Sequence, residues 1–295
     1  MKIQIAKNKT MSDMVRRIPF QEVVDAVTLA CIEAATKLPD DVKNAIKEAQ
    51  ARESSELGKD FLAQYLENAR IAEEYKLPLC QDTGFAVFFV EIGTMVAIDG
   101  GSITEAITAG TERGYELGFL RKSIVSDPLF ARKNTKTNTP PIIHLAQVPG
   151  DRLSVILAPK GGGSENMSAL KMLTPSDGEQ GVIDFVVESV VKAGGNPCPP
   201  TVVGVGIGGT FEKAAFLAKK ALIRPLGTRN DDPEYDRLEQ KILDAINASN
   251  VGPQGLGGDT TSFAVHIEQF PCHIASLPVA VNLNCHVARH AGFEL

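Results

Sequence analysis

The spacing of apolar residues divides the chain into a helical opening and a mixed remainder. Between Ile18 and Glu74, apolar side chains recur at the three- and four-residue intervals of amphipathic helices, and Pro39-Asp-Asp41 is typical of a helix start. We therefore expect three helices in this opening. Further along, Ser102-Ile-Thr-Glu105 has the form of a capping box and predicts that another helix begins there.

Downstream of the opening, runs of β-branched and aromatic residues alternate with helical patterns. The run from Phe85 to Ile92 predicts a buried strand. Two more strands, 142–147 and 153–157, flank the Pro149-Gly150 turn and form a candidate hairpin. The other expected elements are helices at 181–192, 211–222 (capped by Thr210) and 234–246, and strands at 201–205, 263–267 and 275–283.

This order of elements predicts an α+β fold, in the sense of mixed α/β, rather than a regular parallel sheet. We expect one catalytic domain over 1–295, with a helical opening at 1–78 and a mixed part at 79–295. Glycines gather at 161–163, 204–209 and 252–258, each at the edge of a predicted element. Such edges are places where the backbone can approach a ligand closely.

Composition narrows the class of protein. The 295 residues are 43% hydrophobic and 22% charged, which is enough for a substantial core. A net charge of -6, with no basic run interleaved with aromatics, indicates a small ligand rather than nucleic acid or a membrane surface. Met1 to Thr10 has no apolar block of a signal peptide, and no apolar stretch reaches the roughly 20 residues that span a bilayer. Five widely spaced cysteines fit a reducing compartment, so we expect a cytoplasmic protein.

Three of the cysteines stand among turn-forming and polar residues. Cys80 lies in PLCQDTG, Cys198 in NPCPP and Cys285 in NLNCHVARH. Proline and glycine fix the backbone there, which favours chemistry over packing as the role of the thiol. Three thiolates can hold a metal cluster and leave one coordination position open to a substrate. The wide separations match no local zinc or ferredoxin spacing, so distant loops would have to assemble the site.

The other two cysteines receive different interpretations. Cys31 lies on a helix, where a small buried hydrophobe is expected. Cys272, in Phe270-Pro-Cys-His273, is either a loop thiol or a fourth ligand. A fourth ligand would close the site and make it structural or electron-transferring.

The stretch GVGIGG at 204–209 offers a rival function, because it follows a strand and precedes a helix as in a dinucleotide-binding turn. A Rossmann unit then needs a second strand that ends in an acidic residue. Residues 223–232 instead form a polar segment interrupted by proline. A tight strand-to-helix turn is the favoured interpretation.

Several blocks carry a family resemblance in a constant order from about Ile18 to the end. They are LCQDTG (79–84), LRKSIVSDPL (120–129), GGGSENMS (161–168), NPCPPTVVGVGIGG (196–209), GPQGLGG (252–258) and PCHIASLP (271–278). With these blocks the chain resembles the class I, iron-sulfur fumarate hydratase family, in particular its amino-terminal half or α subunit. L-Tartrate dehydratase α subunits are close relatives.

The resemblance implies a [4Fe-4S] cluster held in a cleft by Cys80, Cys198 and Cys285, with Cys272 outside the ligand set. The fourth iron would lack a protein ligand and would act as a Lewis acid in the reversible hydration of fumarate to L-malate. An exposed iron of this kind would also make the enzyme sensitive to oxidants.

The resemblance also assigns substrate contacts. Gln81 and Asp82 would lie beside the cluster, with Asp82 a candidate to handle the proton of the leaving hydroxyl. Arg121 would bind a substrate carboxylate through two points of its guanidinium, and backbone N–H groups near Gly163 would face a carboxylate. His273 would donate a hydrogen bond to the substrate or relay a proton.

Simpler roles compete for several of these residues. Asp82 suits a turn before Thr83-Gly84, and 163–166 suits a plain tight turn. His286 and His290 are either support for Cys285 or polar residues on a helix face, the latter being simpler. His144 and His266 lie in predicted strands, where satisfied core or surface histidines are the usual case.

The length of the chain differs from that of full-length family members, which continue into a second domain that supplies the base for the carbon-bound proton. The resemblance therefore implies a separate β subunit, in a heterodimer or heterotetramer, and little turnover without it. The substrate is a small dicarboxylate, and the GGGSEN and GGDTT (257–261) segments favour fumarate. L-Tartrate dehydratase and mesaconate hydratase remain alternatives, as does a noncatalytic iron-sulfur subunit with Cys272 as fourth ligand.

Overall fold

The computed structural model describes residues 15–295 and divides into two compact units. Among the described residues, the first unit comprises 15–33, 85–158 and 291–295, and the second comprises 34–84 and 159–290. The expectation about Met1 to Thr10 lies outside the described residues. Along 15–295, no helix has both the length and the apolar character needed to cross a bilayer. Helices and mixed sheets occur together in the structure, which confirms the α+β class.

The first unit combines two sheets with two helices. Its larger sheet has the strand order β10-β5-β2-β4, and a second, two-stranded sheet pairs β1 with β3 in parallel. Helix α4 begins at the predicted capping box, where Ser102 and Glu105 bond reciprocally. The elements are β1 Arg16–Pro19, α1 Phe20–Thr36, β2 Phe85–Gly93, β3 Val96–Asp99, α4 Ile103–Leu117, β4 Ile142–Val148, β5 Leu153–Lys160 and β10 Ala291–Glu294.

Helices α1 and α4 cross closely because glycines stand at the crossing. A Cβ placed on Gly110 would come within 2.6 Å of the Val27 side chain, and one on Gly114 within 2.6 Å of Cys31 Cβ. Cys31 is buried there, and burial raises the pKa of its thiol to about 12. The expectation that Cys31 is a packing residue is confirmed.

The predicted hairpin of residues 142–157 is wrong. Both strands form, as β4 and β5, but β2 lies between them and pairs in parallel with β4, placing Val87 opposite Ile142. The physical reason is burial. The β2 run is the most apolar of the three strands, and a position between β5 and β4 pairs both of its edges.

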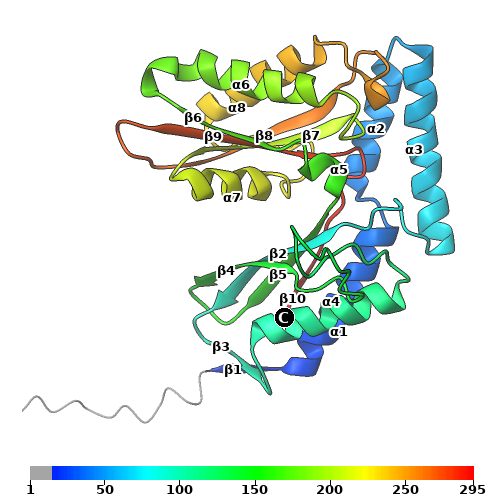
Figure 1. The fold of residues 1–295 in the computed structure, drawn as a ribbon, viewed down its shortest axis with the longest axis vertical. Helices are drawn as coiled ribbons and strands as arrows, with labels where there is room; N and C mark the ends of the chain where they lie inside the picture. Colours follow the sequence, from blue (N-terminus) through cyan, green and yellow to red (C-terminus); the bar gives the residue numbers. More distant parts are fainter. Residues whose placement is uncertain (1–14) are drawn as a thin grey trace, which may run out of the picture. The chain divides into compact units, whose positions relative to one another are not determined.

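The second unit is built on a mixed sheet with the order β6-β9-β7-β8, in which β7 runs parallel to β8 and antiparallel to β9. Helices α6 and α8 cover one face and α7 the other (Figure 1). The core lies between the sheet and α6 and α8, around Val186, Val203 and Ile242. The sheet and its helices are α5 Gly162–Glu165, β6 Ala169–Leu173, α6 Gly178–Ala193, β7 Thr201–Gly208, α7 Phe211–Ala221, α8 Pro233–Asn247, β8 Ser262–Phe270 and β9 Leu277–Asn284.

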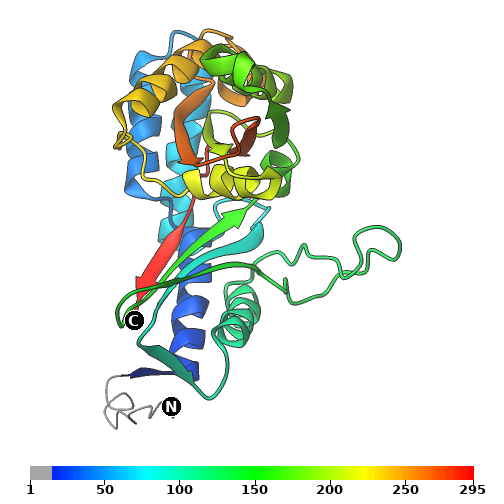
Figure 2. The ribbon, with the colours of Figure 1, turned by 90° about the vertical axis from the view of Figure 1, so that its left-hand side faces the viewer.

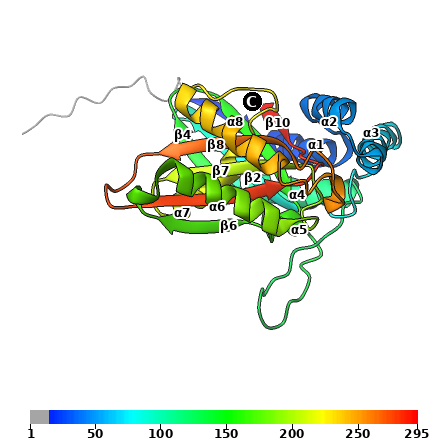
Figure 3. The same ribbon diagram turned by 90° about the horizontal axis from the view of Figure 1, so that it is seen from above.

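Two further helices of this unit, α2 (Asp40–Arg52) and α3 (Glu56–Tyr75), lie side by side next to the sheet (Figure 3). Pro39 precedes α2 as predicted, and the three helices expected before residue 75 are all present. Leu62 of α3 and Ile46 of α2 are fully buried between them. Helix α3 leads directly into the Cys80 loop.

The glycines at 204–209 serve close packing of α7 on β7. A Cβ on Gly204 would stand 2.1 Å from the Ala218 carbonyl oxygen, and one on Gly206 2.0 Å from that of Ala214. This supports the interpretation as a tight strand-to-helix turn. Thr210 is the N-cap residue, but its side chain bonds Glu212 Oε1 instead of capping a backbone N–H, so the predicted side-chain cap is wrong.

His266, in β8, is the satisfied core histidine that its strand position predicted. It is 2% exposed, and its Nδ1 donates to the Ala221 carbonyl at 3.2 Å. Burial, aided by the charge of Arg224, lowers the pKa of His266 to about 4. His144 lies in β4, where its ring stacks on Phe89 with centroids 5.2 Å apart.

Acid should destabilise this fold partly through His266. Because its folded-state pKa is below the unfolded value of about 6.5, its contribution is fully present above pH 6.5 and is lost as the pH falls toward 4. The loss amounts to roughly 3 kcal/mol at most. Urea unfolding at pH 7 and pH 4.5 should show a smaller pH effect in His266→Gln than in wild type. If the free energy of unfolding fell by the same amount between pH 7 and pH 4.5 in both proteins, this account would be contradicted.

Candidate functional site

The second unit gathers the three cysteines picked from the sequence. Cys80 follows α3, Cys198 precedes β7 and Cys285 follows β9. Because β7 and β9 are antiparallel, with Val202 opposite Asn284, the start of one strand meets the end of the other. The charge of Cys80 raises the pKa of both Cys198 and Cys285, after the larger effect of burial, so its sulfur lies within electrostatic reach of the other two.

Cys198 ends a tight turn. Its φ of 55° is in the left-handed region, and its N–H donates to the Gly195 carbonyl at 3.0 Å. The next carbonyl, that of Pro199, accepts the Gln254 N–H at 2.9 Å and the Tyr65 hydroxyl at 3.4 Å. Residues of the glycine segment 252–258 thus support the turn, and the Cys198 side chain is left exposed.

His286 ties the Cys285 strand end to that turn. Its Nδ1 donates to the Cys198 carbonyl at 3.0 Å, its backbone N–H reaches the same oxygen at 3.3 Å, and its ring stacks on Tyr65 with centroids 3.7 Å apart. Burial lowers the pKa of His286 to about 4. The segment 285–290 is not helical, so the helix-face interpretation of His286 and His290 is wrong.

Arg289 ties the same strand end to the Cys80 loop. The guanidinium is 5% exposed, and one terminal nitrogen donates to the Asp82 backbone carbonyl at 2.6 Å. Its positive charge lowers the pKa of Cys285, against the larger effect of burial. The Nε–H is buried and finds no acceptor among residues 15–295. Sequence reasoning missed Arg289, because an arginine in a polar stretch looks solvated until burial is known.

Asp82 connects the Cys80 loop to the glycine segment 161–163. One carboxylate oxygen accepts the Gly84 N–H at 3.0 Å, and the other accepts the Gly162 N–H at 2.8 Å. A Cβ on Gly163 would lie 3.4 Å from the Asn196 carbonyl, which places this segment beside the Cys198 turn. Gln81 is exposed between Cys80 and Asp82. The predicted residues Gln81, Asp82 and Gly163 are therefore all near the cysteines.

A buried polar network, also missed from the sequence, supports the glycine segment. Lys160 is 5% exposed, donates to Ser164 Oγ at 2.8 Å and lies 3.4 Å from the Glu165 carboxylate. Glu165 also pairs with Lys219 at 2.7 Å and accepts from Asn282 Nδ2 at 2.8 Å. Burial lowers the pKa of Lys160 to about 8. The only sequence signal was a lysine placed directly before three glycines.

His273 and Cys272 lie elsewhere in the second unit. The segment 271–276 follows β8 at the end of the sheet where Gly208 pairs with Phe270. At about 3.3 Å per residue, the length of β7 separates that end from the cysteine end by roughly 20 Å. There Cys272 Sγ donates to the Ser276 carbonyl, and His273 is exposed. The structure does not bring His273 to the three cysteines.

Arg121 belongs to the first unit. It lies in the segment 118–141 that follows α4 and extends away from that helix (Figure 2). Inside the segment, Val125 and Asn134 form an antiparallel bridge, and the Asn138 side chain accepts the Ser123 N–H at 2.7 Å. The carboxylate-binding role of Arg121 stays a prediction.

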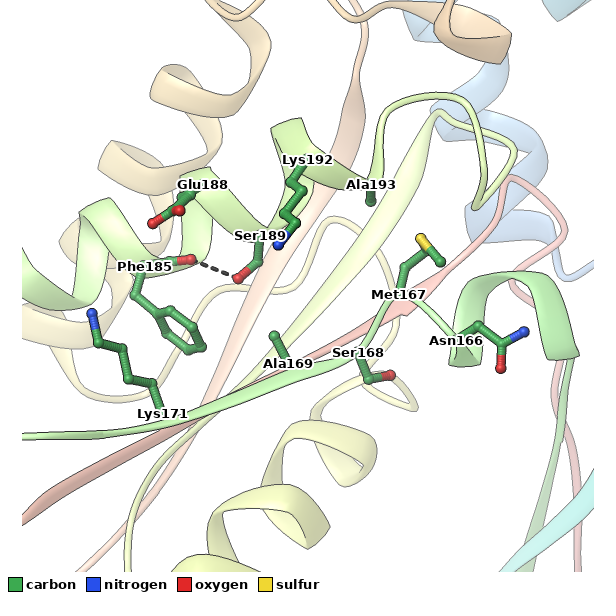
Figure 4. Close-up of a pocket in the computed structure, with 10 residues that line it drawn as sticks. All are labelled: Asn166, Met167, Ser168, Ala169, Lys171, Phe185, Glu188, Ser189, Lys192 and Ala193. Atoms are coloured by element: carbon green, nitrogen blue, oxygen red, sulfur yellow. Dashed lines mark hydrogen bonds between the residues drawn. The ribbon is translucent and has the colours of Figure 1, made fainter. Parts of the chain in front are cut away.

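A cavity of about 450 Å³ lies between β6 and α6 (Figure 4). Lys171 and Lys192 line it together with Phe185, and Ser189 on its wall bonds the Phe185 carbonyl. Its chemistry would suit an anion, but both lysines are exposed to water. No cysteine lines this cavity, so we do not include it in the site.

The three cysteines and their surroundings have the chemistry that the implied cluster requires. Among residues 15–295, no three His, Cys, Asp or Glu side chains converge on one metal ion. A cubane does not require that, because each thiolate ligates a different iron. Raised thiol pKa values at Cys198 and Cys285 disfavour a nucleophilic cysteine, whereas a bound metal deprotonates a thiol outright. The unpartnered Arg289 N–H fits a sulfur-rich anion, so the residues present fit the group.

The amino-acid sequence is also similar to that of known proteins over nearly its whole length. Residues 24–294 match the family model described as fumarate hydratase (Fumerase). The chain is 46% identical over 276 residues to a putative L(+)-tartrate dehydratase subunit alpha of Methanocaldococcus jannaschii, covering 92% of this chain and 96% of that protein. It is 32% identical over 277 residues to the L(+)-tartrate dehydratase subunit alpha of Escherichia coli strain UTI89, covering 93% and 91%.

Proposed function

We propose that this chain, which belongs to the fumarate hydratase family of hydro-lyases, is the α subunit of an enzyme that interconverts fumarate and L-malate. The observation that carries the proposal is that the loops of Cys80, Cys198 and Cys285 are joined at one end of the sheet of the second unit, where the start of β7 meets the end of β9, His286 bonds the Cys198 carbonyl and Arg289 bonds the Asp82 carbonyl. Gln81, Asp82 and the glycine segment 161–163 surround these thiols.

Cys80, Cys198 and Cys285 would hold a [4Fe-4S] cluster in this proposal. When bound, such a cluster with one iron free of protein ligands supplies a Lewis acid for a hydroxyl and its neighbouring carboxylate. The position of Cys272 at the opposite end of the sheet speaks against its use as a fourth ligand, and hence against the noncatalytic electron-transfer alternative.

The chain itself would orient the substrate. Asp82 is held by two backbone N–H donors on different segments, so its carboxylate is fixed where it would take a proton from the adding water in hydration and return it to the leaving hydroxyl in dehydration. The exposed Gln81 amide and the backbone of Gly163 would bind a substrate carboxylate. Because His273 lies at the far end of β7, we do not carry its predicted role into this site.

A partner chain would complete the active site. The relatives described above are named subunit alpha, which implies a β subunit for those proteins, and we propose the same for this chain. Of the carboxylates near the three thiols, Asp82 is assigned above to the hydroxyl proton, and Glu165 is paired with Lys219. A base for the carbon-bound proton of malate would therefore come from β.

L-Tartrate is the second candidate substrate, favoured by the names of the relatives. Tartrate differs from malate by one hydroxyl on the carbon that loses a proton, so a site built for malate leaves that hydroxyl without a partner. We expect kcat/KM of the α/β enzyme to be at least about 100-fold higher for malate than for L-tartrate. Steady-state kinetics with both acids, followed by product absorbance, measures this ratio. The reverse preference would assign the enzyme to tartrate.

A further inference from the structure

We propose that residues 285–289, here called the clasp, fix the other two cysteine loops before any cofactor binds, and that Arg289 also donates its Nε–H to a sulfur of the bound group. The first part concerns the protein alone, whereas the second rests on the proposed function. Arg289 and His286 are thus positioning residues, for which no role was predicted from the sequence beyond support at His286.

The His286 half of the clasp holds the Cys198 turn. Two donors of one residue, the ring Nδ1 and the backbone N–H, meet the same Cys198 carbonyl at 3.0 and 3.3 Å. Stacking on Tyr65 fixes the ring, and Tyr65 itself bonds Pro199 and Gln254. The positive φ of Cys198 at the end of the turn needs such outside support, since this conformation is unfavourable for a residue with a Cβ.

The Arg289 half holds the Cys80 loop through the Asp82 carbonyl at 2.6 Å. The loop has two anchors on the α3 side of Cys80, namely the Leu79 N–H on the Ala35 carbonyl and the Asn68 side chain on the Leu79 carbonyl. On the far side of the cysteine, Arg289 holds the loop together with the bond between the Asp82 carboxylate and the Gly162 N–H.

Charge indicates what else Arg289 binds. Among residues 15–295 the half-buried Arg224 also has a buried Nε–H without an acceptor, but its charge pairs with the carboxylate of Glu239 at 2.5 Å, whereas Arg289 makes no ion pair with any carboxylate. A buried cation without a counter-ion is costly, as is a buried N–H without an acceptor. Cys285 is a thiol within reach of this charge. An iron-sulfur cluster with three thiolate ligands is an anion that would satisfy both demands at once.

Hydrogen exchange of the cofactor-free chain tests the clasp. We expect Arg289→Met to speed amide exchange in the 79–84 segment by about tenfold, the equivalent of one lost hydrogen bond, and to leave 194–201 unchanged. His286→Phe, which keeps the ring stack but removes Nδ1–H, should show the opposite pattern. Arg289→Lys is the matched control that keeps the charge. If amide exchange were unchanged in both Arg289→Met and His286→Phe, or increased throughout the chain in both, the proposed role of the clasp would be overturned.

Iron and acid-labile sulfide content after anaerobic reconstitution tests the donor role. We expect Arg289→Met to retain less than half the iron of wild type and Arg289→Lys to retain more than Arg289→Met. The midpoint potential of the remaining cluster should be more negative in Arg289→Met, because a nearby cation favours the reduced form. Equal iron content and potential in Arg289→Met and wild type would refute the donor role. If wild type takes up no cluster, the proposed function and the donor role both fall, and hydrogen exchange still decides the clasp.

Discussion

Changing Cys80, Cys198 or Cys285 to serine is expected to lower the activity of the α/β enzyme by more than about 100-fold. Loss of residues that merely support metal ligands already costs 10- to 100-fold, and loss of a ligand itself should cost more. Iron and sulfide should fall with activity in all three variants, because each thiolate holds a different iron. Chemical analysis of iron and sulfide together with the malate assay measures both effects.

Cys272→Ser and Cys31→Ala are the matched controls. Cys272 is exposed at the opposite end of the sheet, and Cys31 packs against Gly114 in the first unit. Both variants should keep full iron content and activity, with a modest loss of stability for Cys31→Ala. A loss of iron in Cys272→Ser as large as that in Cys198→Ser would favour a fully ligated, electron-transferring cluster and contradict the open iron.

The α chain alone, reconstituted with iron and sulfide, is expected to turn over at least about 100-fold more slowly than the same chain mixed with its β subunit. A positioned base contributes on the order of 10²–10⁴ to such a reaction, and the α chain leaves none for the carbon-bound proton in this proposal, because Asp82 is assigned to the hydroxyl proton and Glu165 is paired with Lys219. Titrating β into a fixed amount of α should raise activity to a plateau at a fixed ratio.

The matched control for this titration is Cys198→Ser in α. That variant should gain nothing from β, which shows that the activity arises at the cysteine site rather than on β itself. Robust turnover of α without β would defeat the two-subunit proposal while leaving the iron site intact.

Most elements followed from local pattern, but strand pairing did not. The capping box at Ser102 and the strand at Phe85 were both readable, because a helix cap and an apolar run are local signals. The predicted hairpin of 142–157 was wrong, because the local pattern indicates that β4 and β5 are strands but carries no signal that β2 lies between them. Strands of four residues, such as β1 and β10, are too short to show a period.

In the candidate site, too, local features could be predicted from the sequence and features that depend on the fold could not. The three cysteines were distinguishable by their turn-forming neighbours, which is a local property. Arg289 and Lys160 were not, because only the fold reveals that these charges are buried. His273 was assigned to the site by resemblance, and only the topology of β7 and β8 shows at which end of the sheet its loop lies.

Electron paramagnetic resonance of the reduced, anaerobically prepared α/β enzyme tests the central claim most directly. Three thiolates would leave one iron free, so saturating malate or fumarate should change the spectrum of the reduced cluster, while succinate, which has no hydroxyl or double bond, should change it much less. A cluster signal that malate and fumarate leave unaltered, or the absence of any cluster in protein with intact Cys80, Cys198 and Cys285, would contradict the account.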